Sequence, residues 1–510
     1  MELKLEKQPV SVCELLLDTA AEYPIESDLL LPDYCPDIVR ILCCRVQTLC
    51  TDCSAEKSVL TVEGMANVTL CYIGDVGGMR KTEYKIPFSK SFELPRDVSS
   101  PVCSATVEPG RINCRAVSKR RLELHGVLSI RARLYDTAEH AAISKAQGDG
   151  VQLLHRDYPG ARLDGQSSHR FSVAEQLSTP VGKEPAVEIV QIDCRPVVQD
   201  CRPVAGRAVL KGELLVHLLY KTDPETGALE SCDYTLPLSQ MFDLPRLTEE
   251  SRCEARLTCL SADCSVDELD EGIRLEVQLA AWIRCFSPIV LSGATDSFST
   301  LYPTEHTLES LRIPQRVEPI AERVTVRCEA PLPDGAETLL DVWASSSMMA
   351  VENRDDKLVL TGRLAFTMLF SGGELGLDSA SHSCEVASPL SYQGGDVELL
   401  PDIVILSVTG NVLQGKVQLT AELLVTGLWI EFETCQLLTD LTVDEEHPRE
   451  TDRSVGLVIC YASAGESVWD IAKHYGALPE QIMADNGLTE PTLQADTPLM
   501  IPTACLKGEA

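Results

Sequence analysis

The strongest constraint on this fold is an internal repeat with the period of a whole domain. Three strand-like segments match one another, and each carries a central glycine, at Gly64, Gly212 and Gly362, spaced 148 and 150 positions apart. A period this long excludes a solenoid, whose repeats span about 20 to 45 residues. We therefore expect three copies of one domain, followed by a region that does not match them.

Two further landmarks keep the same spacing. A proline that leads into an apolar segment lies 28, 27 and 29 residues before the glycine, at Pro36, Pro185 and Pro333. A Phe-x-Leu-Pro element follows the glycine strand at 92–95 and 242–245, and the third copy lacks it. Three landmarks at matched spacing indicate duplication of one domain.

The pattern within each copy predicts β-structure. Apolar and polar residues alternate over 122–134, 273–283 and 417–430, as in strands with one buried face. Turns rich in Pro, Gly and Asp separate these stretches, which is typical of an antiparallel sandwich or an open barrel. A glycine inside a strand marks a bulge or a close approach of another backbone. The predicted class is mainly β.

One helix is expected before the first copy. Ser11 and Glu14 form a capping-box pattern ahead of Leu15. Linkers are expected at 137–168, 287–318 and 445–456, where the strand pattern breaks. The predicted order is an N-terminal helix, three β units and a C-terminal domain, over residues 1–23, 24–145, 170–300, 320–445 and 457–505.

The C-terminal region predicts a strand, two helices and a second strand. Ser467 can cap a first helix whose apolar residues fall at helical spacing, and Gly476 ends it. A second helix runs from about Pro479 to Asn486, and a final short strand pairs with the first. The apolar residues that we assign to the inner face of the first helix are Val468, Ile471, Ala472 and Tyr475.

This order and these residues resemble the LysM family, whose modules bind ligands and do not catalyse. In that family two loops at one end hold N-acetylglucosamine polymers, so the resemblance implies a glycan- or partner-binding site. With the inner face assigned as above, Trp469 becomes the leading candidate for a surface contact; the alternative is that its indole covers the small core of the domain. The implied site residues are Gly465, Glu466, Ser467, Val468 and Trp469 in one loop, and Asn486, Gly487, Leu488, Thr489 and Glu490 in the other.

The run from Asp28 to Leu42 and the repeat core after it are similar to the SPOCS domain, which is named for spore-coat-associated proteins of endospore-forming Firmicutes. Three such units followed by a LysM module resemble the SipL/SpoVID-type spore coat morphogenetic proteins of clostridia. That resemblance implies a non-enzymatic scaffold made in the mother cell. It would gather at the forespore surface through the coat-morphogenetic ATPase and dock other coat proteins.

The charge and hydropathy of the chain limit the classes of partner that it can bind. The formal net charge is −33 and the pI is about 4.6, which argues against nucleic acid and against anionic membrane surfaces. No stretch approaches the 18 apolar residues that a membrane span requires, and the N-terminus lacks the apolar core of a secretory signal. We expect a cytoplasmic protein without membrane insertion. A mother-cell protein meets the forespore from the cytoplasmic side, so this expectation agrees with a coat location.

The 21 cysteines have three interpretations. Cys50 and Cys53 form a C-x-x-C pair that suits half of a zinc site, but no second pair has suitable spacing. Without export, disulfides are not expected in the compartment of synthesis. Most of the cysteines are interpreted as small apolar core residues, and late oxidative cross-linking in an assembly is the third interpretation.

The sequence predicts no catalytic site, metal or cofactor. It contains no phosphate-binding Gly loop, no H-E-x-x-H and no G-x-S-x-G, and His125 and His217 are isolated within strand patterns. Two functions stay open: an assembly scaffold whose LysM docks protein, and a binder of cortex or wall peptidoglycan. Residues 457–510 carry two Lys against seven Asp and Glu, which favours the scaffold over contact with an anionic wall.

Overall fold

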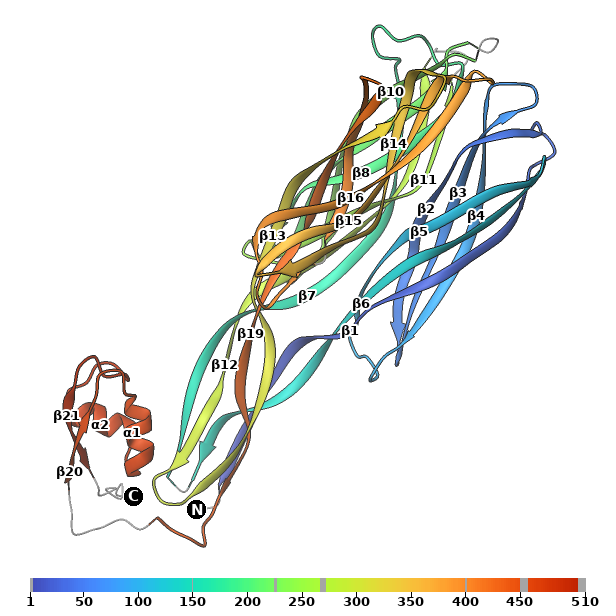
Figure 1. The fold of residues 1–510 in the computed structure, drawn as a ribbon. Coiled ribbons are helices and arrows are strands. Elements are labelled where there is room, and N and C mark those ends of the chain that lie inside the picture. The colour runs from blue at the N-terminus through green and yellow to red at the C-terminus, as the bar shows by residue number, and fades with distance from the viewer. Residues whose placement is uncertain are drawn as a thin grey trace.

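The protein is built almost entirely from antiparallel β-strands, which confirms the predicted mainly-β class (Figure 1). The computed structural model describes residues 3–148, 150–223, 227–266, 272–399, 401–449 and 457–502. Within these residues the two helices both lie in the C-terminal domain. The predicted linker at 445–456 and the end of the domain predicted at 457–505 fall partly outside the described residues.

Each of the three units forms a sandwich of two facing sheets. In the first unit the sheet orders are β1-β6-β5 and β2-β3-β4, and the other units repeat them. The third unit differs in one edge strand, which is split into β17 and β18. The first unit contains β1 (Lys4–Leu30), β2 (Ile38–Glu56), β3 (Val59–Gly74), β4 (Met79–Glu93), β5 (Val102–Ser118) and β6 (Arg121–Gln147).

The other two units follow the same chain order. The second contains β7 (Val151–Leu177), β8 (Glu188–Val204), β9 (Arg207–Lys221), β10 (Leu229–Asp243), β11 (Arg252–Val266) and β12 (Ile273–Ser299). The third contains β13 (Thr304–Pro331), β14 (Ala336–Arg354), β15 (Lys357–Gly372), β16 (Leu377–Gln393), β17 (Val397–Leu399), β18 (Asp402–Leu413) and β19 (Lys416–Val443). Each sandwich encloses its own hydrophobic core.

The repeated glycines lie in the central strands β3, β9 and β15, each opposite a β-bulge in the neighbouring strand. A Cβ on Gly64 would collide with the carbonyl oxygen of Leu49, and one on Gly212 with that of Val197. At Gly362 it would meet Met349. The bulge and the close approach therefore occur together, as a glycine in a strand suggests.

The first and last strands of each unit extend beyond the sandwich as two-stranded ribbons, and the three ribbons pack into a common stalk (Figure 1). Each ribbon has a register shift where it leaves the sandwich, near Leu15, Cys285 and Pro314. Bulges bend strands and increase their twist, which suits a change of direction at this point. Residues from all three ribbons form the stalk core: Val10, Val12, Ala142, Tyr158, Leu291, Leu311, Ile313, Cys435 and Leu437.

The stalk overturns two predictions. The helix predicted over residues 1–23 is instead the start of β1, and the linkers predicted at 137–168 and 287–318 are largely strand, formed by the ends of β6 and β12 and the starts of β7 and β13. Val10 and Val12 are 4% and 3% exposed, whereas Pro9 and Ser11, which alternate with them, are exposed, so the buried pattern has period two here. Pairing of β1 with β6 and burial against the other ribbons outweigh the local capping signal.

The three units also meet through the outer faces of their glycine-bearing sheets. Cys71, Leu219 and Leu369 occupy equivalent strand positions, are at most 1% exposed and share one cluster with Leu42, Val190 and Trp343. Ion pairs surround this cluster: Arg45 of the first unit contacts Asp193 of the second. The units are therefore joined at two levels, in the stalk and at this junction.

Candidate functional site: the LysM domain and its seat on the stalk

The C-terminal domain folds as predicted into β20 (Leu457–Ala462), α1 (Val468–Tyr475), α2 (Pro479–Asp485) and β21 (Thr497–Pro502). The strands pair in antiparallel fashion. The side chain of Ser467 accepts a hydrogen bond from the backbone N–H of Trp469 and caps α1, and Gly476 ends the helix in the left-handed conformation. The predicted cap and stop signals both operate in the structure.

The two loops implied by the LysM resemblance lie at the same end of the domain. The backbone N–H of Val468 donates to the carbonyl of Pro491 at 2.8 Å, and that of Leu493 donates to Glu466 at 3.0 Å. These bonds tie the first loop to the segment that follows the second. Among the predicted site residues, Gly465, Glu466, Gly487, Thr489 and Glu490 are exposed, and Ser467 and Leu488 are partly exposed.

Besides Ser467, which caps α1, three of the ten predicted residues have clear structural roles. Val468 is 1% exposed and belongs to the domain core. The Asn486 side-chain amide donates to the carbonyls of Ile482 and Met500, and its oxygen accepts from the Met500 N–H at 2.7 Å. This amide joins the end of α2 to β21. The third residue is Trp469, whose position differs from the predicted surface contact.

Trp469 lies between the LysM domain and the tip of the stalk. Its ring meets Phe298 of β12 edge-on, with centroids 4.9 Å apart, and its Nε1 donates to Asp296 at 2.8 Å. Only 8% of the residue is exposed, and Phe298 is fully buried in the LysM core cluster. The expectation of a surface Trp469 is therefore wrong: its indole anchors the domain to the body of the same chain.

A charged contact reinforces this seat. Lys473 Nζ lies 2.6 Å from Asp296 Oδ1, one turn along α1 from Trp469. Burial would raise the pKa of Asp296, but its hydrogen bonds from Lys473 and Trp469 lower it. Arg449 closes the contact, because its backbone N–H donates to Leu301 and its guanidinium to the carbonyl of Lys473. The only Lys or Arg of residues 457–502 is thus neutralised, and the open loops carry no basic side chain.

The sequence analysis missed Asp296 and Phe298. Both lie beyond a bulge near the end of β12, and the strand registers make Phe298 equivalent to Gln147 and Thr442 in the other ribbons. An aromatic residue where the other copies carry polar ones was the available signal. Finding it required the strand registers of the ribbons, which were predicted as linkers.

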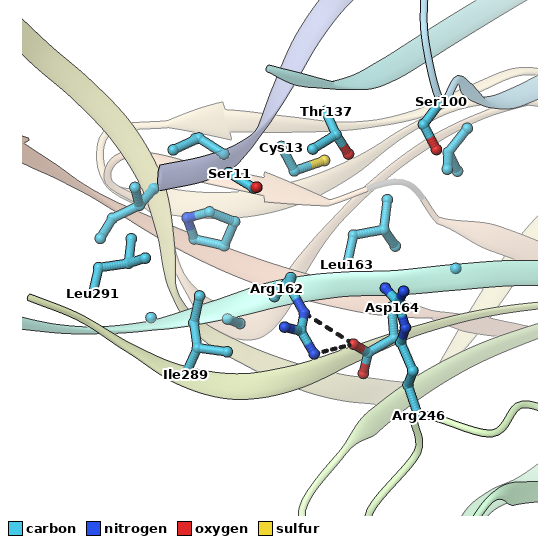
Figure 2. Close-up of a pocket in the computed structure, with 17 residues that line it drawn as sticks. Ser11, Cys13, Ser100, Thr137, Arg162, Leu163, Asp164, Arg246, Ile289 and Leu291 are labelled. Carbon is cyan, nitrogen blue, oxygen red and sulfur yellow. Dashed lines mark hydrogen bonds and ion pairs between the residues drawn. The ribbon is translucent and has the colours of Figure 1, made fainter. Parts of the chain in front are cut away.

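A hollow of about 300 Å³ lies at the neck where the ribbons leave the body (Figure 2). Arg162 pairs with Asp164 at 3.0 Å, and Asp164 also accepts a hydrogen bond from Ser287. The other labelled polar residues of the lining are Ser11, Cys13, Ser100, Thr137 and Arg246. Arg162 and Asp164 are held by their ion pair and by the hydrogen bond from Ser287, an arrangement that supports the neck.

His217 has the most distinctive electrostatic environment among the histidines. Its Nδ1 lies 2.8 Å from Asp233 and its Nε2 lies 2.9 Å from Asp341 of the third unit. Burial opposes its charge, but these two carboxylates raise the pKa of His217 to about 9. Both ring nitrogens are engaged, so the group acts as a buried cation between units. His125, in contrast, is largely exposed.

Two absences hold for the residues that the structure describes. They contain no group of three or more His, Cys, Asp or Glu side chains that could hold a metal ion. They also contain no helix with the length and apolar character of a membrane span.

Comparison with protein families agrees with this architecture. Residues 185–267, which run from just before β8 to the end of β11, match the model described as "SipL, SPOCS domain", and residues 463–502 match the LysM domain model. No curated protein and no solved structure shows significant similarity to the chain. The two matches confirm the resemblance drawn from the sequence. The chain therefore contains a SipL-type SPOCS domain within its second unit and a LysM domain at the tip of its stalk.

Proposed function

We propose that the protein is a non-enzymatic scaffold of spore coat assembly, present in the mother cell at the forespore surface. In this proposal the coat-morphogenetic ATPase and other coat proteins are its partners, and the LysM loops form the docking surface. The single observation that carries the proposal is the seat of the LysM domain. It is anchored by Trp469 and Lys473 to a stalk that all three units build, while five of its ten loop residues stay exposed.

Several features support a docking role over catalysis. The SPOCS and LysM domains are both binding modules. The most perturbed histidine, His217, has both nitrogens engaged by carboxylates. The exposed loop residues Gly465, Glu466, Gly487 and Thr489 offer backbone groups and small side chains, which suit recognition of a peptide or a sugar.

Removal of residues 456–510 tests the proposal. We expect the three-unit body to stay folded, because its cores do not include the LysM domain. We also expect a fluorescent fusion of the truncated protein to lose its accumulation at the forespore. A truncated fusion that still rings the forespore would assign targeting to the three units and contradict the proposal for the LysM domain.

Peptidoglycan binding is the second candidate, supported by the open loops and the LysM fold. Pull-down of the full chain with N-acetylglucosamine polymer, beside pull-down with coat proteins, separates the two functions. Glu466→Lys places a cation in the first loop and should weaken capture of a protein partner at least tenfold. Glu480→Lys makes the same charge change in the first turn of α2, at the end of that helix away from the second loop, and serves as the control. Capture by the polymer alone would favour the glycan function.

A further inference from the structure

Ten cysteines lie in five pairs that join different sheets, and in each pair the two thiols are hydrogen-bonded to each other; a sixth pair, Cys43 and Cys71, lies within one sheet, and Cys253 also contacts Cys285. All of the described cysteines are free thiols in the structure. Two pairs lie in the first unit, two in the second and one in the third. The pairs are Cys53–Cys103 and Cys44–Cys114, then Cys201–Cys253 and Cys194–Cys259, then Cys328–Cys384.

Each of these five pairs bridges the two sheets of a sandwich, whereas Cys43 and Cys71 lie on neighbouring strands of one sheet. In the first unit the pairs join β2 to β5, and in the second they join β8 to β11. In the third unit the pair joins β13 to β16, at the opposite seam. These strands are edges of different sheets and share no backbone ladder, so side-chain contacts alone hold the seams. A covalent bond at this place would close the sandwich.

One pair recurs by position in the repeat. Cys53 is the strand partner of Val62 and Cys201 of Leu210, and both steps equal the 148-residue repeat. The third unit has Val351 in that place, opposite Leu360, and its β17 has no cysteine. The two cysteines are therefore present together or absent together. If the cysteines served only as small apolar core residues, each position would be selected separately, and the two would not need to occur together.

Some of the paired thiols are accessible to a small disulfide and are activated for thiol–disulfide exchange. A hollow of about 580 Å³ between the first two units is lined by both Cys53 and Cys103. Cys114 and Cys259 are partly exposed. A hydrogen bond from the partner thiol lowers the pKa of Cys103, of Cys114 and of Cys259, which favours the reactive thiolate in one member of three of the five pairs.

We propose that these pairs are oxidation sites at which a low-molecular-weight disulfide converts the folded chain into a covalently closed form. One protein thiolate attacks a sulfur of the small disulfide, forms a mixed disulfide and releases one small thiolate. The second protein thiolate attacks the protein sulfur of that mixed disulfide and releases the other. The two protein sulfurs lose two electrons to the small disulfide, and the two thiol protons end on the released thiolates.

Oxidised glutathione and the full-length protein supply the test. After oxidation, unfolding and alkylation, mass spectrometry should find ten cysteines protected and peptides that carry the five predicted links. The chain should remain a monomer on a non-reducing gel. Each link closes a loop of about 50 residues or more, so the melting temperature should rise by on the order of 10 °C. Full alkylation of every thiol, or only links between chains, would overturn the proposal.

The third unit supplies a matched variant. Cys53→Val and Cys201→Val together introduce the residue found at Val351, so the reduced protein should fold as before. Four cysteines should then lose their protection, and the gain in melting temperature should shrink. Cys435→Ala, in the stalk core, should leave all five links in place. An unchanged set of protected cysteines in the double variant would contradict the assigned pairing.

Discussion

The first and last strands of each unit have two halves that bury their side chains against different partners. The inner half lies in the sandwich, and the outer half lies in the stalk. The inner halves of β1 and β6 close a core made within their own unit, with Ile25, Leu29, Leu128 and Leu134. The outer halves place Val10 and Ala142 against Tyr158, Leu311 and Leu437 of the other two units. One strand thus serves a self-contained sandwich and a shared stalk. The repeat defines the sandwich, but the stalk exists only when all three copies are present.

The largest expected effect comes from a charge in the shared region. Val10→Asp places a carboxylate among apolar side chains from three ribbons, which should cost about 4 kcal/mol or more. Hydrogen exchange should increase in the outer halves of β7, β12, β13 and β19, while the three sandwiches stay protected. Ser11→Asp, on the exposed side of the same strand, is the control. Faster exchange confined to β1 and β6 would show that the ribbons are independent.

The junction between units should respond to pH. The folded-state pKa of His217 is about 9, above its ordinary value of 6.5. Its charge therefore stabilises the fold fully below about pH 6.5, and this contribution is lost as the pH rises through about 9. The loss should be on the order of 3 kcal/mol, measured as the free energy of unfolding in urea. His217→Gln should reduce the dependence of the free energy of unfolding on pH between about pH 6.5 and 9. An unchanged dependence would assign it to other titratable groups.

A smaller and local effect is expected at the repeated glycine. Gly212→Val should cost roughly 2 kcal/mol, because its Cβ would collide with the Val197 carbonyl. Lys211→Val, on the exposed face of the same strand, should change stability by less than about 0.5 kcal/mol. Thermal melts of both variants check this. A neutral Gly212→Val would mean that the glycine is merely inherited from the duplication.

The smallest effect on the body is expected at the stalk tip. Trp469→Ala removes the ring contact with Phe298 and the bond to Asp296, so the LysM domain should leave its seat. Because the three sandwich cores do not include this contact, the melting temperature of the body should change by about 1 °C or less. Small-angle scattering should report a broader distribution of shapes. Lys473→Met keeps the contact between Trp469 and Phe298 and removes only the ion pair with Asp296. It should therefore release the LysM domain from the stalk less than Trp469→Ala does.

Sequence patterns predicted the parts of the fold whose partners are close along the chain. Ser467 and Gly476 act within one helix, and the glycine at 212 reports a neighbouring strand, so local rules were enough. Val10 looked helical because the ribbons that bury it start about 150 and 300 residues later. Trp469 was placed on the surface because Asp296 lies 173 residues away. What failed were contacts between repeats, which no local period encodes.

The length of the shared strands has a mechanical consequence. A strand of 27 residues at about 3.3 Å per residue extends roughly 90 Å, and six strands of about this length, paired antiparallel, connect the stalk tip with the sandwiches (Figure 1). Their ladders resist stretching, and the common core resists bending. The LysM domain at the stalk tip and the sandwiches at the other end are therefore kept at a fixed distance from each other.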